Sequence, residues 1–126
     1  MVIPGITPPL GEPGAATPYP STIAVSGLRR GGIRQVAVTL TGLTHTWPSD
    51  LEVLLVGPNG QPILLMHNVG GSEDVIGIFL TFSATARNLE SEPLVSGTYQ
   101  PANFVGPIPD SFLPPAPAGT TGSILA

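Results

Sequence analysis

Two histidines and a few carboxylates are the residues of this chain whose types could support catalysis or metal binding. His45 lies in residues 44–50 (THTWPSD), beside the single tryptophan Trp47, and His67 follows one hairpin later. An imidazole can act as a general base, but serine hydrolysis also needs a positioned nucleophile, and the chain has no Gly-x-Ser-x-Gly elbow. Two histidines without a cysteine thiolate are a weak pattern for zinc.

Asp50 and Asp74 are the candidate calcium ligands. Asp50 ends the 44–50 segment, and Asp74 ends residues 68–74 (NVGGSED), which read as a loop. Calcium takes about six to eight oxygen ligands, so one carboxylate alone would not hold it. The alternative interpretation is structural: Asp50 accepts hydrogen bonds from the backbone of its own turn, as Asp does in turns, and His45 packs and donates to a carbonyl. Apart from calcium, the sequence indicates no cofactor.

The remaining candidates for chemistry are weaker still. Glu90 and Glu92 are close enough in sequence to be considered as a glycosidase pair, but they lie in an apparent loop, where solvated acids are the norm. Gly70 and Gly71 are followed by neither the lysine nor the helix of a phosphate-binding loop. The sequence therefore predicts a protein that is not an enzyme.

The amino-acid composition argues against two classes of partner, nucleic acid and the membrane interior. Only 10% of residues are charged, lysine is absent, and the net charge is −4, which argues against nucleic acid because phosphate binding requires a clustered basic surface. No apolar run approaches the ~18 residues of a transmembrane helix. The absence of cysteine with so few charges is compatible with export, and because residues 1–11 lack the pattern of a signal peptide, we expect any export signal outside this chain.

Apolar residues recur with a period of two, which is typical of strands, and no helical period persists. Asn59-Gly60 predicts a tight hairpin turn with positive φ at both residues. Residues 83–97 read as a loop, and residues 97–119, rich in proline, read as an ordered extended excursion anchored by aromatic and leucine side chains. The predicted strands are residues 21–26, 33–41, 51–56, 63–66 and 75–82.

These elements predict an all-β fold, an antiparallel jelly-roll-like β-sandwich. Residues 1–20 carry six prolines and are expected to form an extended arm, and residues 21–126 are expected to form the folded domain. Trp47, Tyr19 and Tyr99 are too few to favour a carbohydrate-binding face.

Residues 42–66 carry a likeness to a known family. A valine-rich strand is followed by Thr44-His45-Thr46, then Asp50-Leu51, an alternating strand, the turn Pro58-Asn59-Gly60 and the strand with Leu64-Leu65. In this order and spacing the chain resembles the P domain (homo B domain) that follows the catalytic domain of kexin-like and furin-like proprotein convertases. The flanking residues resemble its bacterial branch, found in secreted and surface proteins. The resemblance covers roughly residues 16–126 and implies a jelly-roll fold and an extracellular or cell-surface location.

Family members continue beyond the point that corresponds to Ala126 with further strands, so the resemblance implies a sandwich that this chain leaves incomplete. We therefore expect a structural or interaction module that self-associates by strand addition or exchange, as a filament or a closed oligomer, or that docks on a neighbouring domain. The alternative is an accessory P domain that stabilises a secreted subtilisin-like protease. The side chains expected to make contacts are Val2, Ile3, Ile6, Trp47, Ile124 and Leu125.

Overall fold

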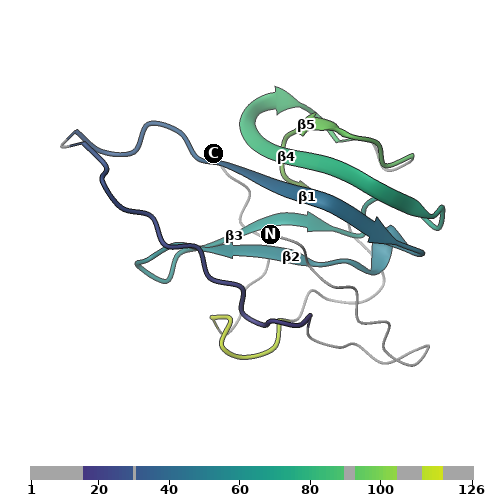
Figure 1. Ribbon diagram of the computed structural model, residues 1–126, viewed down its shortest axis with the longest axis horizontal. Coiled ribbons are helices and arrows are strands. Elements are labelled where there is room, and N and C mark those ends of the chain that lie inside the picture. Colours follow the sequence, from purple (N-terminus) through teal and green to yellow (C-terminus); the bar gives the residue numbers. More distant parts are fainter. Residues whose placement is uncertain (1–15, 30, 90–92, 105–111, 118–126) are drawn as a thin grey trace.

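The computed structural model describes residues 16–29, 31–89, 93–104 and 112–117, and the predicted arm of residues 1–20 therefore lies mostly outside the described part. Within these ranges the chain forms strands and one short 3-10 turn but no α-helix, so the all-β prediction is confirmed (Figure 1). None of the described segments forms a helix that could cross a membrane. The strands are β1 (Ala37–His45), β2 (Val53–Val56), β3 (Pro62–His67), β4 (Val75–Arg87), β5 (Gly97–Tyr99) and β6 (Ala102–Asn103).

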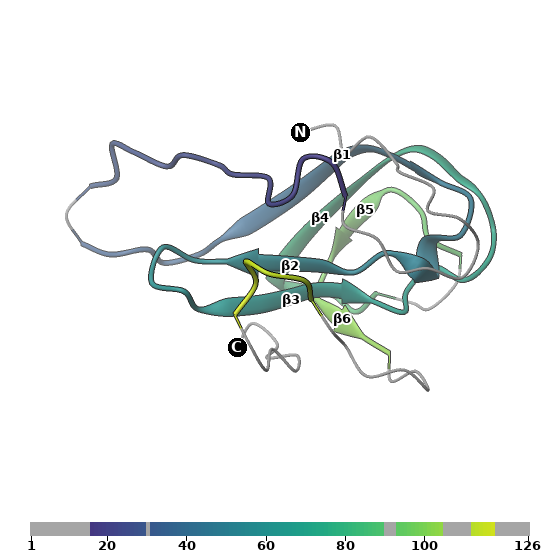
Figure 2. The ribbon, with the colours of Figure 1, turned by 90° about the horizontal axis from the view of Figure 1, so that it is seen from below.

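The strands form two three-stranded sheets, with the orders β1-β4-β5 and β2-β3-β6, which lie as separate layers in Figure 2. The pairs β1–β4 and β2–β3 are antiparallel, whereas β4–β5 and β3–β6 are parallel. The expectation of purely antiparallel sheets is therefore wrong. Parallel neighbours need a crossover connection rather than a tight turn, and the local patterns that predict hairpins do not reveal such long-range pairs.

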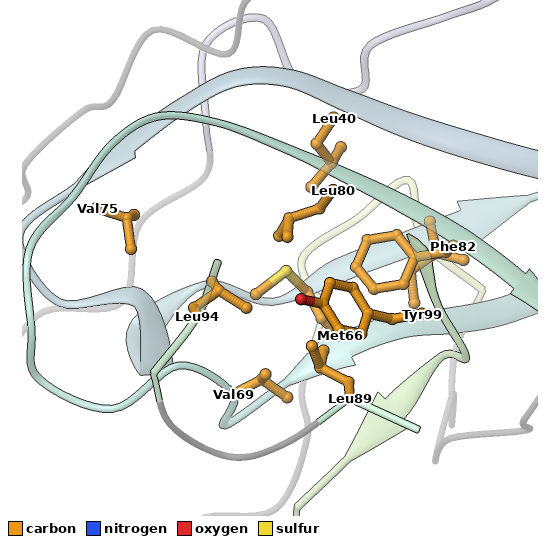
Figure 3. Packing of buried hydrophobic residues seen from close by; sticks show 10 residues of the cluster. Leu40, Met66, Val69, Val75, Leu80, Phe82, Leu89, Leu94 and Tyr99 are labelled. Carbon is orange, nitrogen blue, oxygen red and sulfur yellow. The ribbon is translucent and has the colours of Figure 1, made fainter. Parts of the chain in front are cut away.

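The hydrophobic core lies between the two sheets (Figure 3). Antiparallel register brings Val38 of β1 opposite Phe82 of β4, and parallel register brings Phe82 beside Tyr99 of β5. The side chains with alternate spacing therefore share one face, as the period of two predicts. Buried members of this core are Leu40, Leu65, Met66, Val69, Val75, Leu80, Phe82, Leu89, Leu94 and Tyr99.

The opposite face of the first sheet carries hydroxyl groups. Thr39 of β1 pairs with Thr81 of β4, which pairs in turn with Thr98 of β5, and the Thr39 and Thr81 Oγ1 atoms are 2.9 Å apart. Ser83, two residues along β4, is buried and accepts a hydrogen bond from Gln35 Nε2 at 2.9 Å. The row formed by Thr39, Thr81 and Thr98 across this face is therefore polar but uncharged.

The predicted hairpin forms between β2 and β3, but its turn differs from the prediction. Gly60 N–H donates to Gly57 O at 2.9 Å, so the turn spans Gly57-Pro58-Asn59-Gly60, and only Gly60 has a positive φ, +76°. The expectation that Asn59 and Gly60 both adopt positive φ is wrong. Pro58 fixes its own φ near −65° and favours the second position of a four-residue turn, which moves the turn centre to Pro58-Asn59.

Strand β4 lies at the centre of its sheet, as predicted, but it continues to Arg87, five residues beyond the predicted end. Residues 83–87 are therefore strand rather than loop. Their alternation is easy to miss because the half-buried positions hold only Ala84 and Ala86, which add little hydrophobic contrast. A positive φ at Gly77 (+64°) interrupts the β1–β4 register, and Ile76 beside it is 79% exposed.

Residues 21–29 and 31–36 are exposed and belong to neither sheet, so the strand predicted over residues 21–26 does not form and β1 begins at Ala37 instead of Ile33. Figure 1 shows this segment leaving the sheets and returning at the start of β1. The predicted excursion over residues 97–119 contributes the short strands β5 and β6, and its anchor Tyr99 is buried; residues 105–111 and 118–119 lie outside the described residues.

Candidate functional site

The segment that carries His45, Trp47 and Asp50 forms a corner between the two sheets, joining β1 to β2. Pro48–Asp50 makes a 3-10 turn with Pro48 at its start, where a missing N–H costs nothing. Asp50 N–H donates to Trp47 O and Leu51 N–H donates to Pro48 O, both at 3.0 Å. The corner is thus closed by its own backbone, with the Pro48 ring buried beneath it.

The polar side chains of this corner serve its backbone. Trp47 N–H donates to His45 Nδ1 at 3.0 Å, and Gly77 N–H donates to Thr44 Oγ1 at 2.9 Å. His45 therefore accepts a backbone hydrogen bond instead of donating to a carbonyl, contrary to the structural alternative considered above. That alternative also had Asp50 accept from the turn; its carboxylate is exposed and makes no hydrogen bond to any described residue.

The corner packs against the loop that follows β3. Ser49 N–H donates to Gly71 O at 3.2 Å. Gly70 adopts φ +101° directly against Pro48, and a Cβ atom built on Gly70 would lie 2.7 Å from Pro48 Cβ. Trp47, by contrast, is 52% exposed. The corner therefore has a tightly packed inner side and presents an indole on its outer side.

The candidate calcium ligands do not gather into a cluster with other acids. Asp50, Glu73 and Asp74 are all exposed. Within the described residues, no group of three or more His, Asp or Glu side chains is arranged to hold a metal ion. Glu90 and Glu92 lie outside the described residues.

A further polar cluster of the described chain is one that the sequence patterns did not single out. His67, at the end of β3, is only 3% exposed, and its Nε2 lies 3.0 Å from Glu52 Oε1. Its Nδ1 lies 3.1 Å from both Asn103 Oδ1 of β6 and Asn68 Nδ2. Asn68 Nδ2 also donates to Phe104 O at 2.9 Å. We call Glu52, His67, Asn68 and Asn103 the His67 cluster.

The two contacts of His67 Nδ1 require opposite protonation states of this nitrogen. A protonated Nδ1 donates to Asn103 Oδ1, whereas an unprotonated Nδ1 accepts from Asn68 Nδ2. When Nδ1 accepts from Asn68, the neutral ring carries its proton on Nε2, which donates to Glu52 Oε1; when Nδ1 donates to Asn103, Nε2 can donate as well only if both ring nitrogens carry a proton. These contacts of the imidazole to carboxylate and amide groups connect β3 to β6, where His67 also pairs with Asn103 in the strand register. The only sequence signal was a histidine ending an otherwise apolar strand.

Large apolar side chains are exposed over much of the described surface. Four of them lie in residues 21–29 and 31–36 and are each at least 64% exposed: Ile23, Val25, Leu28 and Ile33. Others lie on β4 or in connections, including Ile76, Phe79, Val95 and Leu113. Contiguous exposed apolar surface is uncommon on monomeric proteins and marks interaction sites. Of the predicted contact residues, Trp47 is exposed, and Val2, Ile3, Ile6, Ile124 and Leu125 lie outside the described residues.

Comparisons with protein-family models, with curated protein sequences and with solved structures gave no match.

Proposed function

We propose that this protein is a non-catalytic, extracellular structural or interaction module that associates with copies of itself through exposed strands. The observation that carries the proposal is that residues 21–29 and 31–36 are exposed and belong to neither sheet although they contain Ile23, Val25, Leu28 and Ile33. A soluble chain gains free energy by covering such side chains. Contacts of His45 and His67 to backbone, carboxylate and amide groups give both side chains a structural role, in keeping with a non-catalytic module.

The magnitude of this burial favours a closed oligomer over an open chain of copies. Full burial of one aliphatic side chain contributes about 1.5–3 kcal/mol, so covering Ile23 and Val25, which one face of a strand would present together, contributes about 3–6 kcal/mol per exchanged segment at most. Association costs about 4–15 kcal/mol in lost translational and rotational freedom. One exchanged segment per contact therefore barely offsets this cost of association, whereas reciprocal exchange places two exchanged segments in a single contact. We accordingly propose a symmetric dimer, with the filament as the less stable arrangement.

We further propose a P-domain-like jelly-roll as the architecture and an extracellular or cell-surface location. The support is the order of the elements: a valine-containing strand, the corner at residues 44–50 that passes from one sheet to the other, and the β2–β3 hairpin with its Pro58-Asn59-Gly60 turn. The low charged fraction of 10% and the absence of cysteine are compatible with that location.

A second candidate function is docking on a neighbouring protein domain, as an accessory P domain of a secreted subtilisin-like protease would do. The exposed Trp47 at the corner favours it, because tryptophan is enriched among the residues that dominate protein interfaces. Sequencing of the flanking reading frame distinguishes the two: a subtilisin-type Asp, His and Ser set upstream supports the accessory role, and its absence supports the self-associating module.

Sedimentation equilibrium over a range of protein concentrations tests the main proposal. We expect the weight-average mass to rise from that of one chain, 12.9 kDa, toward twice that value and then to level off. A mass that continues to rise would replace the dimer by a filament. A folded species that stays at one chain throughout the micromolar range would overturn the proposal.

A further inference from the structure

We infer that the outer edge of β1 is the surface on which the dimer forms, and that its occupant is residues 22–26 of a second copy, added to the sheet as a strand beside β1. This inference rests on the proposed self-association and specifies which surfaces take part. It is carried by three features of the described chain: the character of the β1 edge, the incomplete cover of the core beside it, and the character of the exposed segment.

The β1 edge is the longest free sheet edge in the described chain. With the sheet orders β1-β4-β5 and β2-β3-β6, the edge strands are β1, β2, β5 and β6. β1 has nine residues, against four in β2, three in β5 and two in β6. Its sequence, AVTLTGLTH, contains no Asp, Glu, Lys, Arg or Pro, the residues that natural proteins place on edges to prevent pairing. This edge is therefore competent to accept another strand.

The core is incompletely covered along this edge. Val38 and Leu43 belong to the inward row of β1 and pack against the core, yet they are only half-buried. Phe82 of the central strand β4 lies opposite Val38 in the strand register and is 0% exposed. An added strand with apolar side chains on its inner face would cover Val38 in the way that β1 covers Phe82.

Residues 22–26 (TIAVS) have the pattern that this position requires. Ile23 and Val25 are 65% and 70% exposed and alternate with the small residues Thr22, Ala24 and Ser26. Placed beside β1, Ile23 and Val25 would face the core, and Thr22, Ala24 and Ser26 would continue the hydroxyl-bearing outer face next to Thr39. The segment contains no charge, so its addition brings no charge into the sheet.

A second copy is favoured over the same chain as donor because the segment leaves the sheets instead of folding back along its own β1 (Figure 1). The connection between this segment and β1 contains Gly27, Gly31 and Gly32, which all have positive φ. Glycine adopts many backbone conformations at little steric cost, so the connection can hold the segment either away from its own sheet or beside it. Exchange of an identical element between copies is a common route to a symmetric dimer. Backbone pairing supplies affinity, and the alternating side chains supply register.

A matched pair of charge substitutions tests the donor. In Val25→Lys the charge would face the core of the partner, whereas in Leu28→Lys it would lie beyond Gly27, outside the added strand. In the single chain the Val25 and Leu28 side chains are 70% and 64% exposed, so we expect neither substitution to disturb the fold. We expect Val25→Lys to raise the dimer dissociation constant by roughly tenfold or more, because an unpaired buried charge is strongly unfavourable, and Leu28→Lys to leave it nearly unchanged. Far-ultraviolet circular dichroism confirms that both variants are folded. Equal effects of the two substitutions would overturn the assignment of the donor.

Cross-linking tests the acceptor, and the chain is suited to it because it has no cysteine. An equimolar mixture of Ala24→Cys and Thr39→Cys variants should form a disulfide-linked heterodimer on mild oxidation. A mixture of Ala24→Cys with Thr98→Cys, on the same face but at the opposite edge of the sheet, should not. Comparable cross-linking in the two mixtures would overturn the β1 edge as acceptor.

The outcomes separate this inference from the proposed function. A dimer that is insensitive to Val25→Lys and does not form the Ala24–Thr39 cross-link retains self-association but overturns this edge and this donor. A wild-type chain that remains monomeric overturns both. A double variant Ala24→Cys with Thr39→Cys that forms its disulfide within one chain assigns the edge to the chain's own segment and overturns the second copy as occupant.

Discussion

The packing of Gly70 against the corner gives the sharpest stability prediction. Gly70 has φ +101°, and an added Cβ would lie 2.7 Å from Pro48 Cβ, 3.0 Å from Leu94 Cδ2 and 3.1 Å from Leu94 Cβ. Gly60 in the β2–β3 turn has φ +76°, and nothing lies within 4 Å of its added Cβ. The two glycines therefore share the conformational penalty of positive φ and differ in the steric one.

For Gly60→Ala we expect a loss of about 1–2 kcal/mol in the free energy of unfolding, the penalty for an L-residue with left-handed backbone geometry. For Gly70→Ala the same penalty applies, and overpacking adds about 1–3 kcal/mol because the added Cβ would meet Pro48 and Leu94, which are both buried. The total of about 2–5 kcal/mol is a large part of the ~5–15 kcal/mol that stabilises a typical domain.

Urea denaturation of both variants, followed by far-ultraviolet circular dichroism and by Trp47 fluorescence, measures the difference. With a denaturant slope of ~1–3 kcal/mol per molar, Gly70→Ala should lower the midpoint by roughly 1 M more than Gly60→Ala does. Equal midpoints for the two variants would refute the reasoning, because they would mean that the corner and the loop after β3 are not packed together.

The remaining predictions concern the core and the His67 cluster. Phe82→Ala should lower the free energy of unfolding by about 3–5 kcal/mol by opening a cavity at a side chain that is 0% exposed, whereas an unchanged denaturation midpoint would remove Phe82 from the core. Gly97→Ala should lower it by about 1–3 kcal/mol, because an added Cβ would lie 2.8 Å from Tyr99 Oη; thermal denaturation that matches the wild type would contradict that contact. Glu52→Gln should lower it by about 1 kcal/mol by weakening the 3.0 Å contact to His67 Nε2, and urea titration with no change would indicate that water replaces the carboxylate.

Local patterns predicted those parts of the fold that local interactions determine. The hairpin at residues 51–66, the strand through Val38 and Leu40, and the central strand from Val75 follow from alternation and turn residues, and all three form. The parallel neighbours β5 and β6 were not predicted, because they have only three and two residues and pair with strands distant in sequence. The predicted strand at residues 21–26 has the right alternation but no partner strand within the described chain, and alternation alone does not make a ladder.

The candidate sites show the same limit. Residues 44–50 were recognised as a polar corner, but the direction of the His45 hydrogen bond depends on the position of the Trp47 N–H, which only the folded turn defines. The His67 cluster unites residues from β3, from the segment before β2 and from β6, and no sequence motif links Glu52 to Asn103. Exposure of Trp47, Ile23 and Val25 likewise depends on which neighbours the fold provides.

The proposed dimer requires residues 22–26 to become a paired strand when the protein associates. Amide hydrogen exchange measured at low and at high protein concentration examines this directly, since unpaired extended backbone exchanges rapidly and ladder amides are protected. We expect amides in residues 22–26 and along the outer edge of β1 to gain protection as concentration rises, with those of the β2–β3 hairpin unchanged. Rapid exchange of residues 22–26 at every concentration, in a sample whose mass is that of a dimer, would contradict the account.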